Sequence, residues 1–392
     1  MLSLCYDLYT LKRFFWIVFV IALIGGLYFA VKTYFPFLIS NFIPVNKEVK
    51  QFLPLNSETQ ALSPFKISEG YRMDIFADLN NDLPRVIIFD DSGNMVVSLT
   101  SKGKIAVLTD SDLDLKSESK TDLLTGLNKP HGIAINGNYL YVAETDGVSR
   151  YLYNSNELIV GEKELLFSLP AGGRHFTRTI MIHNDKLYTS VGSSCDSCIE
   201  ENPFRASILV SELDGSNLKV FAKGLRNTVF FDFDSSGKMW GADMGRDGLG
   251  DNLPGEEINI IDEGKDYGWP YCYGNQVKDL KFNTDKSITC EATEVPVYEM
   301  PAHTAPLGFV FDDFGGLYVA LHGSWNSTEP VGYKVIKLST FAGGASGMQD
   351  FITGFIQTGD KVLGRPAGLV FDKKGNLYIS DDKTGLIYVV TK

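Results

Sequence analysis

The segment LVFDKKGNLYISDD, residues 369–382, contains the pattern that decides the fold. An apolar strand leads into the turn sequence KKGN, and a second strand centred on Leu377 and Tyr378 follows the turn. Glycine and asparagine tolerate the positive φ that a tight turn between two strands requires. The segment therefore predicts a β-hairpin of two consecutive strands.

The same unit recurs five more times along the chain. The other copies are VIIFDDSGNMVVSL (86–99), IAINGNYLYVAE (133–144), IMIHNDKLYTSV (180–191), VFFDFDSSGKMWGAD (229–243) and FVFDDFGGLYVALH (309–322). The centres of the second strands lie 45 to 78 residues apart, which suits one four-stranded blade for each copy plus insertions. Six copies predict an all-β, six-bladed β-propeller over residues 63–392. Two stacked β-sandwiches are the alternative, but they would not require six copies of one hairpin.

A ring of blades has to close without leaving an unpaired strand edge. The segment FKISEGYRMDIFADL (65–79) is a further strand candidate, and it precedes the first copy of the hairpin. We expect this segment to complete the blade that ends at residues 387–390, so that the two ends of the propeller meet in one sheet.

The composition is that of a globular protein with a large core. The chain has 392 residues, of which 44% are apolar. It carries 48 acidic and 36 basic side chains, a formal charge of −12, and no block rich in lysine or arginine. Such a chain lacks the basic surface that tracks a phosphate backbone, so nucleic acid is excluded as a partner.

Residues 14–31 (FFWIVFVIALIGGLYFAV) form a run of 18 residues without a charge. At about 1.5 Å per residue, a helix of this length crosses the hydrocarbon core of a bilayer. Lys12 and Arg13 precede the run and favour a cytoplasmic N-terminus. We therefore predict one transmembrane helix: residues 1–32 are the cytoplasmic tip and anchor, 33–62 a juxtamembrane linker, and the propeller lies on the periplasmic or extracellular side of the cytoplasmic membrane. A cleaved signal peptide is the alternative, although no clear A-x-A site follows the run.

The cysteines are consistent with an oxidising compartment. Cys272 and Cys290 bracket a polar loop, and Cys195-x-x-Cys198 follows a predicted strand. Either pair can form a structural disulfide; buried thiols, a redox motif or a metal site are the alternatives. We expect the bond between Cys272 and Cys290 in particular, because the insertion that they crosslink carries the segment YGWP (267–270) at the site face. Cys5 lies on the other side of the predicted span and should be a free thiol.

Polar residues gather where the predicted hairpins meet one mouth of the ring. In each hairpin, the residue before the first strand and the residue after the second lie at the same face. The positions before the first strands carry Arg85, His131, His175 with Arg178, Arg226 with Asn227, His303 and Arg365; those after the second strands carry Glu144, Ser193, Asp243, His322 and Asp381. Four of the five histidines therefore lie at one mouth. An acidic protein that concentrates arginine and histidine there suits an anionic ligand, although polar rings also line non-catalytic propeller channels.

The largest insertion, GADMGRDGLGDNLPGEEINIIDEGKDYGWPYCYGN (241–275), falls at the same face. Its glycines permit close approach of the backbone, and its carboxylates and carbonyls are the hard oxygen ligands that Ca²⁺ takes. A solvated acidic loop is the alternative interpretation of Asp251, Glu256 and Glu257.

Six segments in combination resemble the glucose/sorbosone dehydrogenases that depend on pyrroloquinoline quinone (PQQ), most closely the sorbosone-type branch. They are GLRNTVF (224–230), GRDGLGDNLPGEEIN (245–259), YGWPYCYG (267–274), PAHTAPLGF (301–309), ALHGSWNSTEPVGYKV (320–335) and GRPAGLVF (364–371). The resemblance covers residues 65–392. It implies oxidation of a sugar or sugar aldehyde with PQQ and Ca²⁺ as cofactors, by hydride transfer to the quinone, and a respiratory quinone or cytochrome as electron acceptor.

The resemblance also implies roles for individual residues. His175 would be the general base that takes the proton of the substrate hydroxyl, and Arg226 would lie beside the quinone oxygens. The residues implied in cofactor binding are Arg178, Asn227, His322 and Arg365. The backbone carbonyls of Gly245 and Arg246 would hold Ca²⁺.

Three features depart from the glucose-type enzymes of this family. His322 stands where they have a cofactor lysine, and Ala367 stands where they have a second arginine. The spacing from His175 to Arg178 is also one residue shorter. These departures argue against glucose itself as the substrate and indicate weaker binding of PQQ.

Two other functions are open at this stage. Six-bladed Ca²⁺ propellers also include lactonases and related hydrolases, whose metal is held by side-chain carboxylates and amides at the channel centre. The positions before the first strands here carry arginine and histidine, which argues against that class. A non-catalytic binding propeller is the third possibility.

Overall fold

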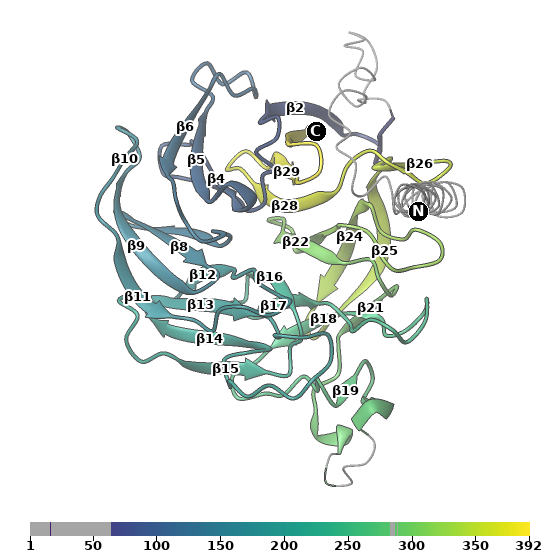
Figure 1. The fold of residues 1–392 in the computed structure, drawn as a ribbon. Coiled ribbons are helices and arrows are strands. Elements are labelled where there is room, and N and C mark those ends of the chain that lie inside the picture. The colour runs from purple at the N-terminus through teal and green to yellow at the C-terminus, as the bar shows by residue number, and fades with distance from the viewer. Residues whose placement is uncertain (1–15, 17–63, 283–286, 288) are drawn as a thin grey trace, which may run out of the picture.

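Six antiparallel sheets of four or five strands stand around a common axis as the blades of a propeller (Figure 1). The computed structural model describes Trp16, residues 64–282, Ser287 and residues 289–392. In every blade the first two strands correspond to one copy of the hairpin found in the sequence. The predicted all-β, six-bladed propeller is therefore confirmed.

The first three blades follow one another along the chain. Blade one consists of β3 (Ile87–Phe89), β4 (Met95–Leu99), the 3-10 helix η1 (Thr100–Lys102), β5 (Lys104–Thr109) and β6 (Ser119–Leu124). Blade two consists of β7 (Ile133–Asn136), β8 (Tyr139–Glu144) and β9 (Gly147–Asn154), and β9 pairs with both β10 (Ile159–Val160) and β11 (Glu164–Ser168). Blade three consists of β12 (Ile180–His183), β13 (Lys186–Val191), β14 (Ser207–Glu212) and β15 (Lys219–Lys223).

The last three blades carry the insertion and the closure. Blade four consists of β16 (Thr228–Phe233), β17 (Met239–Asp243), β18 (Glu256–Ile261) and β21 (Tyr298–Met300), and its insertion contains β19 (Cys272–Tyr273), β20 (Val277–Lys278), η2 (Leu280–Phe282) and η3 (Cys290–Ala292). Blade five consists of β22 (Pro306–Phe311), β23 (Gly316–Leu321), β24 (Lys334–Phe341), β25 (Gly344–Thr353) and β1 (Lys66–Ile67). Blade six, which follows the small hairpin β26 (Ile356–Gln357) and β27 (Lys361–Val362), consists of β28 (Pro366–Phe371), β29 (Leu377–Asp381), β30 (Leu386–Thr391) and β2 (Arg72–Asp78).

An aspartate side chain organises the turn of the repeated hairpin. In blade six, Asp372 Oδ1 accepts hydrogen bonds from the backbone N–H groups of Lys374 and Asn376, at 2.9 and 2.8 Å. The same pair of bonds is made by Asp90, Asp234 and Asp312. These bonds satisfy the turn backbone locally and fix the register that follows, in which Val370 lies opposite Tyr378.

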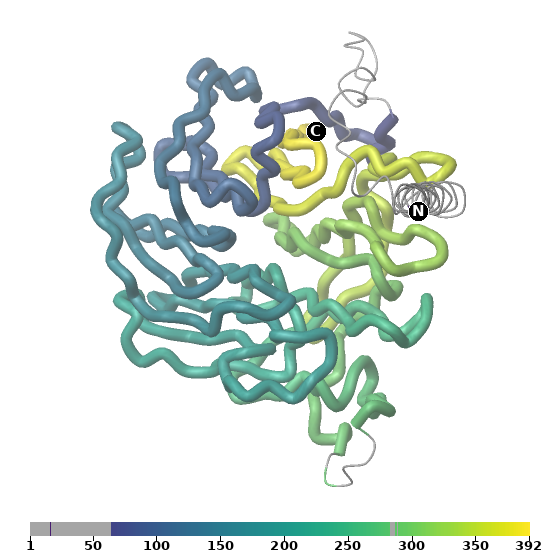
Figure 2. The backbone as a smooth tube through the Cα atoms, viewed as in Figure 1, coloured from purple at the N-terminus to yellow at the C-terminus, as the bar shows by residue number. Residues whose placement is uncertain are grey.

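The ring closes where the two ends of the propeller meet. Strand β2 pairs antiparallel with β30, so that Met73 lies opposite Val390, as the sequence predicts. Figure 2 shows the purple start of the described chain beside its yellow end. Strand β1 belongs to the same predicted segment but pairs with β25 of blade five, with Lys66 opposite Thr353. The predicted single strand over 65–79 is thus two strands, and each completes a different blade.

The core lies between neighbouring blades. Strands β4 and β23 are buried along their whole length. Trp240, only 1% exposed, belongs to an apolar cluster with Val142 and Val319, which come from three different blades. Burial of a large apolar side chain stabilises a fold by roughly 1.5–3 kcal/mol. The packed blades therefore provide a rigid frame for the loops at the mouth.

Two disulfides join Cys195 to Cys198 and Cys272 to Cys290. The predicted bond between Cys272 and Cys290 is confirmed. Cys5 lies outside the described residues, and its free thiol stays a prediction.

Loss of the Cys272–Cys290 bond is expected to destabilise the propeller. The bond closes a loop with a sequence separation of 18. In the chain-entropy account a crosslink of this span contributes about 3 kcal/mol, because it restricts the unfolded chain. Denaturant unfolding of Cys272→Ser/Cys290→Ser should show a free energy of unfolding lower by about that amount. A double variant as stable as the natural chain would contradict this expectation.

No helix among the described residues is long and apolar enough to cross a membrane. The predicted anchor (1–32) and linker (33–62) lie outside the described residues, apart from Trp16. Both stay predictions, as does the division of the chain at residue 63.

Candidate functional site

A cavity of about 450 Å³ opens at one mouth of the propeller. Its basic and amide side chains belong to loops of five different blades: Arg85, Arg174, His175, Arg226, Asn227, His303, His322 and Arg365. All except Arg174 occupy the positions before first strands or after second strands that the sequence assigned to this mouth. The structure therefore brings together six of the eight predicted site residues around one space: His175, Arg226, Asn227, His322, Arg365 and Gly245.

His175 has its tautomer fixed by the cavity wall. Its Nδ1 lies 2.8 Å from Ser193 Oγ and 3.0 Å from Ser193 O. The Ser193 hydroxyl donates its own proton to the carbonyl of Cys195, at 2.7 Å. Both atoms that face Nδ1 therefore act as acceptors, so Nδ1 carries the hydrogen. The lone pair is on Nε2, to which no described residue donates a hydrogen bond.

The environment also keeps the imidazole uncharged. Burial lowers the pKa of His175 to about 3, helped by the positive charges of Arg226 and Arg174. A neutral imidazole with a free lone pair on Nε2 is the form that accepts a proton from a substrate hydroxyl. The group can therefore act as a general base at neutral pH.

Arg226 is held against the wall by hydrogen bonds to three acceptors. Its Nε donates to Asp196 O at 2.9 Å, and Nη2 donates to Asp196 Oδ1 at 2.7 Å. Nη1 donates to the carbonyl of Met244 at 3.1 Å. Arg226 as a residue is only 4% exposed, yet it lines the cavity. Its charge is thus presented to the cavity in one orientation.

Gly192 allows His175 and Asn227 to pack side by side. A Cβ at this position would lie 2.6 Å from Asn227 Oδ1 and 2.7 Å from His175 Cβ. Both distances are well inside van der Waals contact, so any side chain at residue 192 would displace the two neighbours. The close pairing of the histidine and the asparagine depends on this glycine.

The buried carboxylates after the second strands tie down the loops before the first strands. Asp243 accepts the backbone N–H groups of Arg226 and Asn227, at 2.9 and 2.7 Å. Asp381 accepts the N–H of Arg365 at 3.0 Å, and Glu144 does the same for Asn128 at 2.7 Å. These carboxylates lie at the predicted face, but their oxygens are directed to the protein backbone. Asp243 and Asp381 thereby position cavity residues of their own blades, whereas Glu144 holds Asn128, which does not line the cavity.

His322 forms a half-buried pair with Asp382. Its Nε2 lies 2.7 Å from Asp382 Oδ1, and Arg85 Nε lies 3.0 Å from Asp382 Oδ2. Burial and the charge of Arg365 lower the pKa of His322 to about 4. Burial opposes the ionisation of Asp382, but the interactions with His322 and Arg85 lower its pKa below the usual range. His322 is therefore a neutral side chain whose Nε2–H is used by Asp382, unlike the lysine of the glucose-type enzymes.

Arg365 donates to the backbone carbonyls of His322, at 3.0 Å, and Gly323. Its guanidinium also lies over the ring of Tyr333, 5.5 Å from the ring centre. Among the described residues it forms no ion pair with a carboxylate. Arg365 therefore adds a positive charge to the cavity that no direct partner neutralises.

Two of the residues at the predicted positions before the first strands do not line the cavity. Arg178 is fully buried and donates to the carbonyls of Thr177, His175 and Pro170, at 2.8, 3.1 and 2.9 Å. The predicted direct contact of Arg178 with a cofactor does not fit this placement; its bonds support the segment that carries His175. His131 is also fully buried, with Nδ1 3.2 Å from Thr179 Oγ1.

The insertion of blade four brings Gly245 to the cavity wall. The N–H of Gly245 donates to Glu256 Oε2 at 2.8 Å, and the side chain of Arg246 pairs with Asp279, Nε to Oδ2, at 2.5 Å. No described residue donates a hydrogen bond to the carbonyl of Gly245 or Arg246. These two hard oxygens are therefore available to a cation.

The carboxylates of the insertion have separate partners. Asp251 is exposed, and its Oδ1 accepts the N–H of Thr328 at 3.1 Å. Glu257 is buried and accepts the N–H of Gly274 at 2.6 Å. Burial raises the pKa of Glu256 to about 7 and that of Glu257 to about 8. Glu256 and Glu257 thus belong to the folded wall, whereas Asp251 lies in an exposed loop.

The rim of the cavity contains an aromatic platform that the sequence did not single out. Trp325 is 51% exposed and lines the cavity, and the guanidinium of Arg174 lies over its ring, 5.6 Å from the centre. Asp247 joins the group, because it pairs with Arg174 and accepts a hydrogen bond from Asn326 Nδ2 at 2.6 Å. The indole is therefore held at the mouth beside fixed polar groups.

Comparison with known proteins is consistent with this geometry. A family model described as TrAA12-like matches residues 65–392. An uncharacterized protein of Borreliella burgdorferi is 30% identical over 84% of this chain and 91% of its own length. A pyrroloquinoline quinone-dependent pyranose dehydrogenase of Coprinopsis cinerea is 26% identical, over 79% of this chain and 52% of the relative. A pyrroloquinoline quinone-dependent sugar dehydrogenase of Hypocrea jecorina is 24% identical, over 78% and 85%.

Solved structures show the same propeller. An iodide structure of the Trichoderma reesei carbohydrate-active enzyme family AA12 superposes with a TM-score of 0.75 at 23% identity, over 83% of this chain and 97% of that chain. The holo PQQ domain of the Coprinopsis cinerea pyranose dehydrogenase superposes with a TM-score of 0.73 at 24% identity, over 85% and 98%. The predicted resemblance to PQQ-dependent dehydrogenases is confirmed. With a match that spans every blade and the loops of the cavity, the chain belongs to the TrAA12-like family.

Proposed function

We propose that this chain is a PQQ- and Ca²⁺-dependent dehydrogenase that oxidises an aldose or a sugar aldehyde. The observation that carries the proposal is the uncharged His175, whose Nδ1–H is fixed by Ser193 and which lies with Arg226 at the cavity. Two relatives bear the names of PQQ-dependent pyranose and sugar dehydrogenases, which supports the same cofactor and substrate class here.

The charges around the cavity fit an anionic quinone that carries carboxylates. Arg85 pairs with one protein carboxylate, and Arg174 and Arg226 each pair with two, those of Asp196 and Asp247. Arg365 has only backbone and aromatic partners among the described residues. Arg365 would therefore pair with a cofactor carboxylate, and Arg226 would face the oxygen on which charge grows. The carbonyls of Gly245 and Arg246 would hold Ca²⁺ beside that oxygen.

The residues of the chain divide the chemistry between them. When bound, PQQ supplies a quinone carbon that accepts hydride, and Ca²⁺ polarises it. His175 takes the hydroxyl proton at Nε2, while Ser193 keeps the imidazole in the productive tautomer. Arg226, fixed by Asp196 and Met244, stabilises the growing negative charge without having to reorganise. We further propose that the electrons pass to a respiratory quinone or a cytochrome.

A titration with PQQ tests the cofactor directly. PQQ added to the full chain should give a saturable spectral change in the presence of Ca²⁺ and a weaker one with a chelator, since the cation and Arg365 both act on the cofactor. Arg365→Gln should weaken the binding, because it removes the charge. No saturable binding under any of these conditions would refute the proposed function.

Trp325 is proposed to bind the sugar ring. The flat apolar face of an indole packs against the C–H face of a sugar, and nearby carboxylate and amide groups bind its hydroxyls. We therefore expect Trp325→Ala to raise KM for the sugar by about tenfold, a loss of roughly 1.4 kcal/mol, with little change in kcat. Trp325→Phe should restore most of the affinity. Phe314→Ala removes another exposed aromatic side chain, one that lies in a hairpin turn and does not line the cavity, and serves as the control.

The N-terminal run of apolar residues is proposed to anchor the propeller to the cytoplasmic membrane, with the propeller outside. The proposal rests on residues 14–31 alone. We expect the full chain to sediment with membranes and to resist extraction by high salt. A chain that starts at residue 51 should remain in the supernatant and keep the same dye-linked activity, because every site residue lies beyond residue 63. A full chain found only in the supernatant would contradict the anchor.

A further inference from the structure

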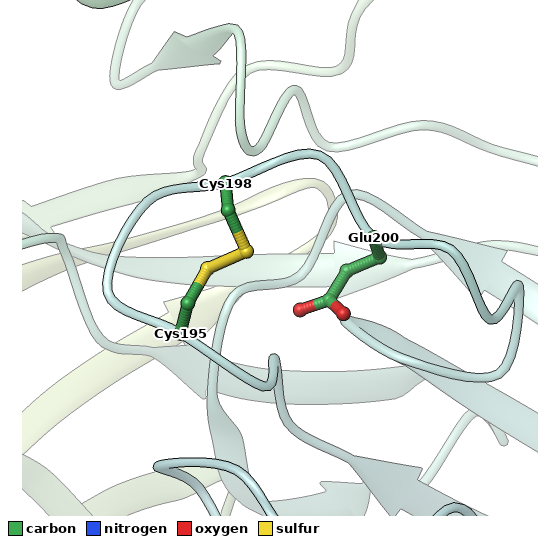
Figure 3. Close-up of side chains that lie close together, drawn as sticks. All are labelled: Cys195, Cys198 and Glu200. Carbon is green, nitrogen blue, oxygen red and sulfur yellow. A yellow bond between two sulfur atoms is a disulfide. The ribbon is translucent and has the colours of Figure 1, made fainter.

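The loop after β13 is closed by the disulfide between Cys195 and Cys198 (Figure 3). Its Asp196 contacts Arg226, which lines the cavity. Both cysteines are half-buried. The carboxylate of Glu200 folds back over the loop and accepts the N–H and the hydroxyl of Ser194, at 2.5 and 2.8 Å. No role has been given to the disulfide so far. The loop contacts both proposed catalytic groups, His175 through Ser193 and Arg226 through Asp196.

One contact leads to His175. The carbonyl of Cys195 accepts the proton of the Ser193 hydroxyl at 2.7 Å. Since that proton is used, Ser193 Oγ can only accept from Nδ1 of His175, 2.8 Å away. The position of the Cys195 carbonyl therefore decides whether Ser193 Oγ joins the Ser193 carbonyl, 3.0 Å from Nδ1, in holding the Nδ1–H of His175.

The other contact leads to Arg226. Asp196 lies between the two cysteines, and both its carbonyl and its carboxylate accept hydrogen bonds from the Arg226 guanidinium, at 2.9 and 2.7 Å. The same carboxylate accepts the N–H of Asp247 at 3.0 Å. The turn that the disulfide closes thus holds the guanidinium and the neighbouring loop together.

A crosslink over a sequence separation of 3 restricts the unfolded chain far less than the bond between Cys272 and Cys290, whose separation is 18. Its main effect is local, because it fixes the directions of the Cys195 and Asp196 carbonyls. From these contacts we infer that the Cys195–Cys198 disulfide is a redox-sensitive positioning element for His175 and Arg226. The inference rests on the proposed function.

The chemistry of the switch is a thiol–disulfide exchange. A dithiol reductant transfers two electrons and two protons to the sulfur atoms, the S–S bond breaks, two thiols form, and the dithiol becomes a disulfide. In the reduced loop the Cys195 and Asp196 carbonyls are free to turn. The Ser193 hydroxyl then lacks its fixed acceptor, so its hydrogen bond with Nδ1 of His175 weakens, and Arg226 loses part of its support. Misplacement of catalytic groups by about 1 Å can lower the rate by on the order of 10²-fold.

The test begins with selective reduction of the full chain. The protein is treated with dithiothreitol under native conditions, alkylated, and freed of reagents before PQQ is added, because a dithiol also reduces quinones. Peptide mapping should show alkylation of Cys195 and Cys198 before Cys272 and Cys290, which are 4% and 5% exposed. We expect the treated protein to lose turnover by 10- to 100-fold, to bind PQQ more weakly and to keep its melting temperature within a few degrees.

Two double variants separate the disulfides. Cys195→Ser/Cys198→Ser should have low turnover and a shifted pH profile of kcat/KM, and dithiothreitol treatment should change neither. Cys272→Ser/Cys290→Ser should melt at a lower temperature but still lose turnover on treatment. Unchanged kcat, pH profile and PQQ affinity after confirmed reduction of Cys195–Cys198 would overturn the inference.

Nitrogen-15 NMR of the histidines gives a readout that does not depend on the enzyme activity. The signal of His175, assigned by its loss in His175→Ala, should report an Nδ1-protonated ring in the oxidised protein and a shifted Nδ1 resonance after reduction, because one of the two acceptors at Nδ1 is lost. If the signal shifts on reduction but the oxidised protein oxidises no sugar, the proposed function fails and the positioning role stands. An identical His175 signal in both redox states would refute the positioning role.

Discussion

Replacement of His175 by alanine is expected to lower turnover by about 10²- to 10⁴-fold while the affinity for PQQ changes little. The imidazole is neutral, its Nδ1–H is held by Ser193, and Nε2 is free to accept a proton. The charged groups that would bind the cofactor are elsewhere, on Arg226 and Arg365. Dye reduction and PQQ titration, measured on the same preparation, separate the two effects.

The control for this variant is His183→Ala. His183 ends β12 at the turn of the hairpin, away from the cavity, and stacks on Phe233 with ring centres 4.0 Å apart. Its loss should leave kcat unchanged. A His175→Ala protein that keeps near-normal turnover at saturating PQQ and Ca²⁺ would remove His175 from the mechanism.

Arg226→Ala should weaken both PQQ binding and turnover. The side chain is the permanent charge next to His175, and its hydrogen bonds hold Asp196 and the Met244 carbonyl. Removal deprives the half-buried Asp196 carboxylate of its nearest charged partner, and the loss of such a hydrogen bond typically costs about 1–3 kcal/mol. We expect the Kd for PQQ to rise at least tenfold, kcat to fall, and the melting temperature to drop by several degrees.

Arg226→Lys provides the matched comparison. Lysine keeps the charge but cannot donate along the same fixed directions to Asp196 and Met244 at once. It should recover part of the PQQ affinity and less of the turnover. Normal PQQ affinity in Arg226→Ala would show that the cofactor is held without this residue.

The fold could be predicted because its information is local. Each hairpin carries its own turn signal, and in blade six Asp372 and the residues it binds lie within four positions of one another. Pairings between distant segments were harder to foresee. The segment 65–79 divides between two blades because β1 pairs with the edge strand β25 of blade five, while β2 pairs with β30. The residues of 65–79 alone do not indicate which edge each strand will pair with.

The position of site residues followed from the repeat, but the direction of each side chain did not. Arg178 and His131 occupy predicted positions, but their side chains are buried in the wall. Arg178 is bonded to backbone carbonyls and His131 to Thr179. Asp196 matters because it holds the guanidinium of Arg226, a residue 30 positions away in sequence. Such partners meet only when the blades close, so alternation along one strand cannot identify them.

Trp325 was missed for a related reason. It lies in the loop between β23 and β24, outside the repeated hairpin, and only the folded position of Arg174 over its ring places it at the rim of the cavity. An exposed tryptophan beside a histidine and glycine pair, as in the segment HGSW (322–325), was the available signal in the sequence.

The most direct test of the account is sugar-dependent reduction of an artificial dye by the full chain. The protein is loaded with PQQ and Ca²⁺ and offered a panel of aldoses and sugar aldehydes, with parallel samples that lack PQQ, Ca²⁺ or the sugar. We predict dye reduction that requires all three and that falls by about 10²-fold or more in His175→Ala. Saturable PQQ binding without dye reduction for any sugar in the panel would contradict the account.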